Sequence, residues 1–251
     1  SAAKGDTLKK LRGLSTELAR YTAIIEVTAE KFTWAISDHV LKYPLIYVKP
    51  DLLREGDELQ LNIEAKFIKN YTSRNVIAYL PAKKKSKKTI VYTAHYDHLG
   101  RMGSDTYFPG ANDNASGTAM LISMAKYFKE NPQDYNVLFI AFAGEEAGLH
   151  GSKYFVEHPL FKLKKMTFLL NLDIMGSGEE GITVVNATLF KPEFDSLKEL
   201  NLEGSYLTQV KSRGPAANSD HYFFTEKGVP AFFVYTMGPN KNYHDIHDKY
   251  E

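Results

Sequence analysis

From residue 58 onward, short apolar segments with strand character alternate with segments that carry a helical pattern. Helices are expected over residues 115–129 and through Tyr154, each lying between apolar runs. This alternation is typical of a three-layer αβα domain, in which helices cover both faces of a central mixed, mostly parallel sheet. The expected strands cover residues 59–67, 75–80, 88–94, 137–142, 167–172, 182–185 and 230–235.

The N-terminal part of the chain has a different pattern. Residues 6–20 carry leucines at spacings of three and four, which predicts an amphipathic helix. A strand over 23–28 and two strand-like pieces within 32–48 follow. We therefore expect a small N-terminal α+β segment over residues 1–55, followed by a larger domain over residues 56–251.

The composition excludes several classes of protein. Of the 251 residues 43% are hydrophobic and 24% are charged, which is enough to build a core and excludes a disordered chain. The net charge of +1 gives no general attraction to nucleic acid. No apolar run approaches the roughly 20 residues that a membrane span needs. We expect neither a nucleic-acid partner nor a membrane span.

Cysteine is absent from the chain. This excludes a disulfide framework, a thiolate zinc site, an iron–sulfur cluster and a cysteine nucleophile. Any metal ion must therefore bind to His, Asp or Glu. The first residues, SAAK, also lack the apolar stretch of a signal peptide, which indicates either a cytoplasmic protein or one whose leader has been removed.

Side chains that bind metals follow the predicted strands. In open α/β sheets, ligands bind beyond the carboxyl ends of the strands, so these positions are where chemistry is expected. Imidazoles and carboxylates together suit a pair of zinc ions where no thiolate is available. The residues at these positions are His95, Asp113, Glu145, Glu146, Asp173 and His244.

Two spacings support a metal site. His95 and Asp97 are two residues apart, so on an extended strand both face the same side, and the carboxylate is placed to accept the second N–H of the imidazole. Glu145 and Glu146 are adjacent and point in different directions. One of them is therefore expected to bind metal, while the other takes a proton from metal-bound water.

Six segments of the chain carry a resemblance to a known family. They are AHYDHLG (94–100), PGANDNASGTAMLISMA (109–125), LFIAFAGEEAGLHGSKYF (138–155), LLNLDIMG (169–176), SDHYFFTEKGVPAFF (219–233) and YHDIHD (243–248). In this order they resemble the co-catalytic dizinc exopeptidases, which include secreted bacterial leucyl aminopeptidases and glutamate carboxypeptidases.

The resemblance implies a zinc-peptidase fold, a peptide substrate and an aminopeptidase activity. It also implies export from the cell, and it suggests that the N-terminal segment is a remnant of a protease-associated module. Glu145 would be the general base, Asp97 the carboxylate behind His95, and Tyr243 the phenol that polarises the scissile carbonyl. The implied ligands of two zinc ions are His95, Asp113, Glu146, Asp173 and His244, with Asp113 as the bridge.

Other interpretations remain open. Arg213 or Lys211 would suit a carboxypeptidase or dipeptidase of the same family, because a terminal carboxylate needs a cation. A single-zinc glutaminyl cyclase and a catalytically silent peptide-binding domain are two further alternatives. His98 and His247 are alternative metal ligands.

Overall fold

The computed structural model describes residues 10, 13–37, 39–54 and 56–250. The chain divides into two compact units. Unit 1 comprises Ser1–Thr33 and Ser37–Tyr71, and unit 2 comprises Trp34–Ile36 and Thr72–Glu251. Part of the helix expected over residues 6–20 lies outside the described residues, and residues 13–18 are helical.

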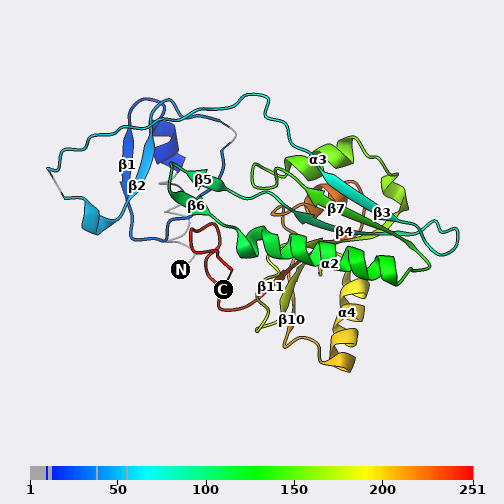
Figure 1. Cartoon of the computed structure of the whole chain (residues 1–251). Helices are drawn as coiled ribbons and strands as arrows, with labels where there is room; N and C mark the ends of the chain where they lie inside the picture. Colours follow the sequence, from blue (N-terminus) through cyan, green and yellow to red (C-terminus); the bar gives the residue numbers. More distant parts are fainter. Residues whose placement is uncertain (1–9, 11–12, 38, 55, 251) are drawn as a thin grey trace. The chain divides into compact units, whose positions relative to one another are not determined.

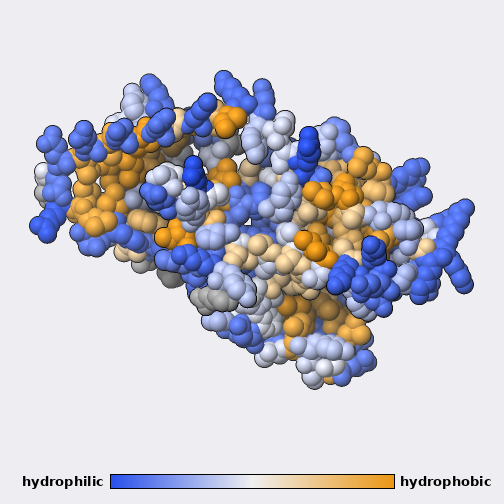
Figure 2. Space-filling view, viewed as in Figure 1, coloured by the Kyte–Doolittle hydropathy of each residue, from blue (hydrophilic) through white to orange (hydrophobic). Residues whose placement is uncertain are grey.

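Unit 1 contains one pair of parallel strands among its described residues. β1 (Ile24–Val27) runs beside β2 (Leu45–Val48), and η1 (Pro50–Leu52) follows. Two strand-like pieces are expected within 32–48; among the described residues of this range, β2 alone is a strand. Figure 2 shows hydrophobic residues gathered on the surface in the region of β1 and β2.

The strand expected over residues 59–67 is absent, so that prediction is wrong. Leu59, Leu61, Ile63 and Phe67 alternate with polar residues, yet their exposed fractions are 42–56%. An alternating pattern makes a strand only where a neighbouring strand accepts its backbone hydrogen bonds and a core covers its apolar face. This segment has neither.

Unit 2 contains a mixed sheet of seven strands in the order β10-β9-β11-β8-β4-β7-β3. β3 is antiparallel to β7 and β9 is antiparallel to β11, whereas the other neighbours are parallel. The strands are β3 (Val76–Leu80), β4 (Thr89–His95), β7 (Asn136–Phe142), β8 (Met166–Leu172), β9 (Ile182–Val185), β10 (Val210–Ser212) and β11 (Ala231–Thr236).

Helices cover both faces of this sheet, which confirms the three-layer αβα prediction. Figure 1 shows α2 lying across the sheet near β4. Each strand presents alternate residues to the two faces: Val137 and Phe139 of β7 pack with Leu121 of α2, whereas Leu138 and Ile140 belong to a cluster on the opposite face. The helices are α2 (Gly117–Glu130), α3 (His150–Glu157), α4 (Lys191–Gly204) and α5 (His221–Glu226).

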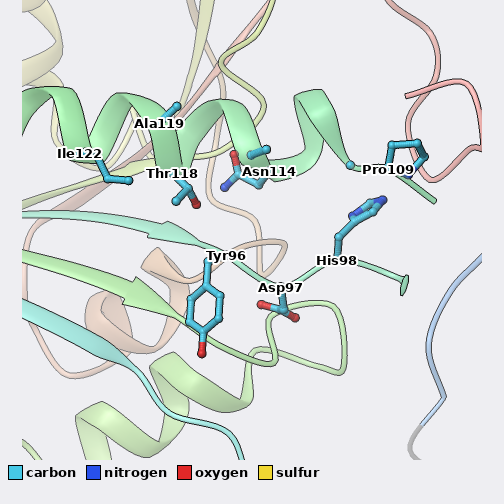
Figure 3. A pocket seen from close by; sticks show the side chains of 10 residues that line it. Tyr96, Asp97, His98, Pro109, Asn114, Thr118, Ala119 and Ile122 are labelled. Atoms are coloured by element: carbon cyan, nitrogen blue, oxygen red, sulfur yellow. The ribbon is translucent and has the colours of Figure 1, made fainter. Parts of the chain in front are cut away.

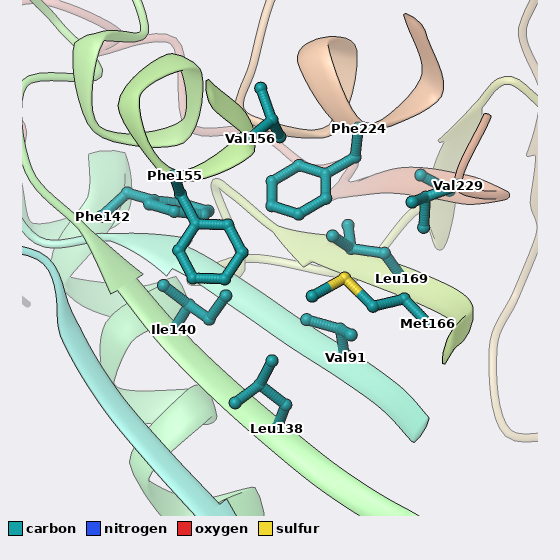
Figure 4. Packing of buried hydrophobic residues seen from close by; sticks show 11 residues of the cluster. Val91, Leu138, Ile140, Phe142, Phe155, Val156, Met166, Leu169, Phe224 and Val229 are labelled. Atoms are coloured by element: carbon teal, nitrogen blue, oxygen red, sulfur yellow. The ribbon is translucent and has the colours of Figure 1, made fainter. Parts of the chain in front are cut away.

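The core on the α3 and α5 face is aromatic at its centre. Phe142 of β7, Phe155 of α3 and Phe224 of α5 pack against one another with ring centroids 5.7–6.2 Å apart (Figure 4). Burial of such side chains contributes about 1.5–3 kcal/mol each. Val91 of β4 and Leu169 of β8 belong to the same cluster, so this core joins the three strands beyond which the candidate site lies.

Three smaller features complete the described part of unit 2. A hairpin of β5 (Gly100–Met102) and β6 (Thr106–Phe108) and an irregular turn, η2 (Ala111–Ser116), connect β4 to α2. The short η3 (Leu163–Lys165) precedes β8. In the described ranges, no helix combines the length and the apolar character that crossing a membrane requires.

Candidate metal centre

Carboxylates and imidazoles converge beyond the carboxyl ends of β4, β7 and β8. His95 ends β4, Glu145 and Glu146 follow β7, and Asp173 follows β8. Two groups of three potential ligands form here, each with ligand atoms within 4.8 Å of one another. They are His95 with Asp113 and Asp173, and His98 with Asp113 and Glu146. Asp113 belongs to both groups.

One half of the cluster is centred on His95, whose side chain is 1% exposed. Its Nε2 lies 3.3 Å from Oδ1 of Asp113 and 3.3 Å from Oδ1 of Asp173. Oε2 of Glu145 is 3.9 Å away. Ligand atoms around one zinc ion stand roughly 3.3 Å apart, so His95, Asp113 and Asp173 have the spacing of such a site.

The other half lies on the opposite oxygen of Asp113. Oδ2 of Asp113 is 3.2 Å from Nε2 of His244, and the same nitrogen is 2.9 Å from Oε2 of Glu146. Nδ1 of His98 is 2.8 Å from Oε1 of Glu146. Asp113 therefore turns one oxygen toward each half, which is the geometry that a bridging carboxylate needs.

His95 and His244 are oriented by main-chain carbonyls. Nδ1 of His95 lies 3.1 Å from the backbone oxygen of Asp97, and Nδ1 of His244 lies 2.9 Å from the backbone oxygen of Trp34, which belongs to unit 2. Donation of the outer N–H to such a carbonyl leaves Nε2 free to act as a ligand. The sequence alone did not reveal this role of the Trp34 carbonyl, because Trp34 and His244 are 210 residues apart in the chain.

The carboxylate of Asp97 contacts the loop after β7 rather than the ring of His95. Its Oδ1 is 3.8 Å from Nδ1 of His95, beyond hydrogen-bond distance. The two oxygens instead accept the backbone N–H groups of Glu145 and Glu146, each at 3.2 Å. Asp97 thereby holds the two adjacent glutamates against the end of β4.

Asp248 supports the bridging carboxylate in a similar way. Its two oxygens accept the backbone N–H groups of Asn112 and Asp113 at 2.9 and 3.0 Å. Asn114, the next residue, accepts the N–H of Gly117 at the start of α2. These contacts hold η2 in a fixed conformation. His247, by contrast, is exposed and is not a member of either ligand group.

The cluster has an excess of negative charge. Burial alone would lower the pKa of His95, but Asp173, Asp113 and Glu145 together raise it well above its usual value. His244 behaves likewise: burial opposes its charge, yet hydrogen bonds to Asp113 and Glu146 raise its pKa to about 10. Carboxylates that retain protons on two buried imidazoles form an environment that favours cations.

Glu145 differs from the other carboxylates. Burial, reinforced by Asp173, Asp220 and Glu146 and partly offset by His95, raises its pKa to about 9. In Glu146, by contrast, hydrogen bonds from His244 and His98 outweigh burial and lower the pKa. The two adjacent glutamates therefore differ in proton affinity, as expected if one binds a cation and the other transfers a proton.

A pocket of about 290 Å³ opens on the first half of the cluster. Tyr243 lines it, and its ring stacks on His244 with centroids 3.8 Å apart. Burial and then the carboxylates of Asp113 and Glu146 raise the pKa of Tyr243, so its phenol keeps its proton. Arg213 also lines the pocket, and its Nη1 donates a 3.3 Å hydrogen bond to the Tyr235 hydroxyl.

The chain is similar to known aminopeptidases. The chain is 32% identical over 208 residues to aminopeptidase YwaD of Bacillus subtilis strain 168, covering 77% of this chain and 42% of that protein. The structure of BSAP, a zinc aminopeptidase from Bacillus subtilis, superposes with a TM-score of 0.66 at 25% identity, covering 90% of this chain and 57% of that one.

The fold is shared beyond aminopeptidases. A glutaminyl cyclase from an Acidobacteriales bacterium has a TM-score of 0.57 at 26% identity, covering 70% of this chain and 65% of that one.

The chain spans about half the length of its aminopeptidase relatives. Residues 75–251, which include both ligand groups, match the model of one protein family. The chain therefore belongs to peptidase family M28.

Proposed function

We propose that this chain is the catalytic part of a zinc aminopeptidase that uses two zinc ions. The observation that carries the proposal is the position of Asp113, whose two oxygens face two separate groups of imidazole and carboxylate ligands. The proposed ligands are His95 and Asp173 on one side, His244 and Glu146 on the other, and Asp113 between them. The names of the relatives YwaD and BSAP support zinc and an aminopeptidase activity.

The charge of the site suits this role. Three ligand carboxylates against two Zn²⁺ ions leave the centre with about one positive charge, which favours an anionic nucleophile and an anionic transition state. When bound, zinc supplies Lewis-acid polarisation of the scissile carbonyl and activation of the attacking water. All other steps are assigned to side chains of this chain.

Glu145 is the proposed general base. It lines the pocket beside His95 and is not needed as a ligand. Cations at the cluster would offset the carboxylates that raise its pKa, bringing it toward the range in which a base works at neutral pH. Glu145 then takes the proton of the attacking water and returns it to the leaving amine. Tyr243 donates a hydrogen bond from its phenol to the developing oxyanion.

A carboxypeptidase or dipeptidase is the second candidate, favoured by the position of Arg213. Its guanidinium group lies in the wall of the same pocket, where a terminal carboxylate would meet it. Substitution Arg213→Gln separates the two candidates. An aminopeptidase is expected to hydrolyse leucyl anilide within a few fold of the wild-type rate, whereas a carboxypeptidase loses binding of substrates with a free terminal carboxylate.

The direct experiment measures metal content per chain together with hydrolysis of leucyl and alanyl anilides, with and without a chelator. Two zinc ions per chain and chelator-sensitive release of the anilide are expected. One metal ion per chain with cyclisation of N-terminal glutamine would support a glutaminyl cyclase instead. Two metal ions with no hydrolysis of any free or N-blocked peptide would indicate a silent binding domain.

Export and the N-terminal segment belong to the same proposal. We infer that the protein acts outside the cytoplasm, on the resemblance to secreted bacterial leucyl aminopeptidases, and that residues 1–55 are a remnant of a protease-associated module. The parallel pair of β1 and β2 shows that these residues contain strands of their own. Fractionation of the native organism, with an antibody against this chain, tests the compartment.

A further inference from the structure

His98 contacts one of the proposed ligands without being needed as one. Its Nδ1 lies 2.8 Å from Oε1 of Glu146, and the two side chains are 11% and 3% exposed. The other oxygen of the same carboxylate, Oε2, is 2.9 Å from Nε2 of His244. Two histidines thus hold opposite oxygens of Glu146.

The ring of His98 has a closely packed position. Figure 3 shows it leaving the chain in the opposite direction from Asp97, toward Pro109. A Cβ added at Gly110 would lie 2.5 Å from Cγ and Cδ2 of this ring, so the imidazole occupies space that a side chain at residue 110 would take. The ring also meets His244 edge to face, with centroids 6.0 Å apart. Packing therefore directs Nδ1 at Glu146.

The hydrogen bonds of His98 differ from those of the two proposed histidine ligands. In His95 and His244, Nε2 faces the cluster and Nδ1 meets a main-chain carbonyl. Histidines that bind metal nearly always have such an outer partner. Nε2 of His98 is buried and has no hydrogen-bond partner among the described residues. His98 therefore lacks the outer support that a ligand has.

We infer that His98 is a positioning residue for Glu146. Its Nδ1–H donates to Oε1, which prevents rotation of the carboxylate and presents Oε2 to the zinc position shared with Asp113 and His244. This inference rests on the proposed dizinc function. The rival role is that of an extra ligand, because ligand atoms of His98, Asp113 and Glu146 lie within 4.8 Å of one another.

Three substitutions distinguish these roles: His98→Ala, His98→Asn and His98→Gln. The amide nitrogen of Asn lies near the position of Nδ1, whereas that of Gln lies near Nε2. Loss of a partner that orients a ligand typically weakens metal affinity by about 10–100-fold. We expect His98→Ala to lower the affinity for one of the two zinc ions by that factor. His98→Asn should retain most of the wild-type affinity for this ion, and His98→Gln should retain little of it.

The measurement is zinc affinity by competition with a coloured chelator, supported by metal count per chain in native mass spectrometry. The zinc ion held by His95 and Asp173 should keep its wild-type affinity and serves as the internal reference. His158→Asn, on the exposed C-terminal cap of α3, is the matched control and should leave both affinities unchanged. Circular dichroism establishes that each variant is folded before its affinity is compared.

Two results would overturn the inference. Wild-type zinc affinity in all three variants would show that His98 does not act on Glu146. If both His98→Ala and His98→Asn bind one zinc ion fewer than the wild type even at saturating metal, His98 is a zinc ligand rather than a positioning residue. By contrast, a wild-type protein that binds no zinc would refute the proposed function itself, so the two failures are distinguishable. If His98→Ala does not fold, the zinc affinities of His98→Asn and His98→Gln still show whether a donor at the position of Nδ1 is what Glu146 needs.

Discussion

The hydroxyl of Ser219 donates a 2.7 Å hydrogen bond to Oδ2 of Asp173. Ser219 in turn accepts a hydrogen bond from Nδ2 of Asn171 at 2.7 Å, and Oδ1 of Asn171 accepts one from the hydroxyl of Thr93 at 2.6 Å. Ser219, Asn171 and Thr93 are fully buried. This chain of polar groups links β4, β8 and the segment just before α5, and it leaves Oδ1 of Asp173 facing His95.

Ser219→Ala is therefore expected to affect both stability and metal binding. It removes the donor to Asp173 and leaves the amide of Asn171 without its acceptor, and a buried unsatisfied group costs about 1–3 kcal/mol. Zinc affinity should fall by about 10–100-fold because Asp173 loses its orientation. Urea denaturation and chelator competition measure the two effects.

Ser123→Ala is the matched control, since Ser123 lies on the exposed side of α2 and its hydroxyl donates only to the backbone oxygen of Ala119. It should change the free energy of unfolding by less than about 0.5 kcal/mol. Equal effects of the two substitutions would contradict a special role for Ser219.

Glu145→Gln is expected to retain zinc and lose turnover. The amide has nearly the shape of the carboxylate but does not accept a proton, and general-base catalysis contributes about 10²–10⁴-fold to a rate. The kcat for leucyl anilide should fall by that factor, with two zinc ions still bound. Glu157→Gln, at the exposed end of α3, is the control. Wild-type kcat in Glu145→Gln would exclude Glu145 as the base.

Burial of Asp220, which is not a proposed ligand, is expected to make the stability of the protein depend on pH. Asp220 is fully buried, and burial raises its pKa to about 7. The unfolded carboxyl releases its proton near pH 3.8, whereas the folded one holds it to about pH 7. Between these values the unfolded state binds fewer protons, so the free energy of unfolding falls as the pH rises.

Asp220→Asn removes this titration. The variant should gain stability over the wild type progressively from about pH 4 to pH 7, and the difference should level off above that range. Urea denaturation at pH 4, 5.5, 7 and 8 measures it, with the exposed Asp134→Asn as reference. A difference that does not depend on pH would show that Asp220 titrates normally.

Leu138→Ala tests the core on the α3 and α5 face. Leu138 is fully buried within the cluster of Figure 4, so its truncation should cost about 2–5 kcal/mol in the free energy of unfolding. Leu160→Ala, at a side chain that is 74% exposed, should change the same quantity by less than about 0.5 kcal/mol. Similar losses for both would mean that Leu138 is not part of a closely packed core.

Local patterns were sufficient for the elements with strong periodicity. The apolar run of β7 and the apolar stripe of α2 predicted those elements to within two residues, since side-chain alternation and helical spacing act over a few residues. The same reasoning missed α4 and α5 and placed a strand at 59–67. A strand depends on a partner elsewhere in the chain, which a local pattern does not supply.

The sequence by itself determined the fold class, the family and the residue types that gather at the strand ends. Tertiary structure alone decided which atoms meet: the two oxygens of Asp113 facing His95 and His244, the carboxylate of Asp97 holding the glutamate amides, and His98 against Glu146. The physical reason is that these contacts join residues from segments that are far apart in the chain. Their distances are set by the strand order of the sheet and by side-chain packing, and neither is encoded within a short stretch of the chain.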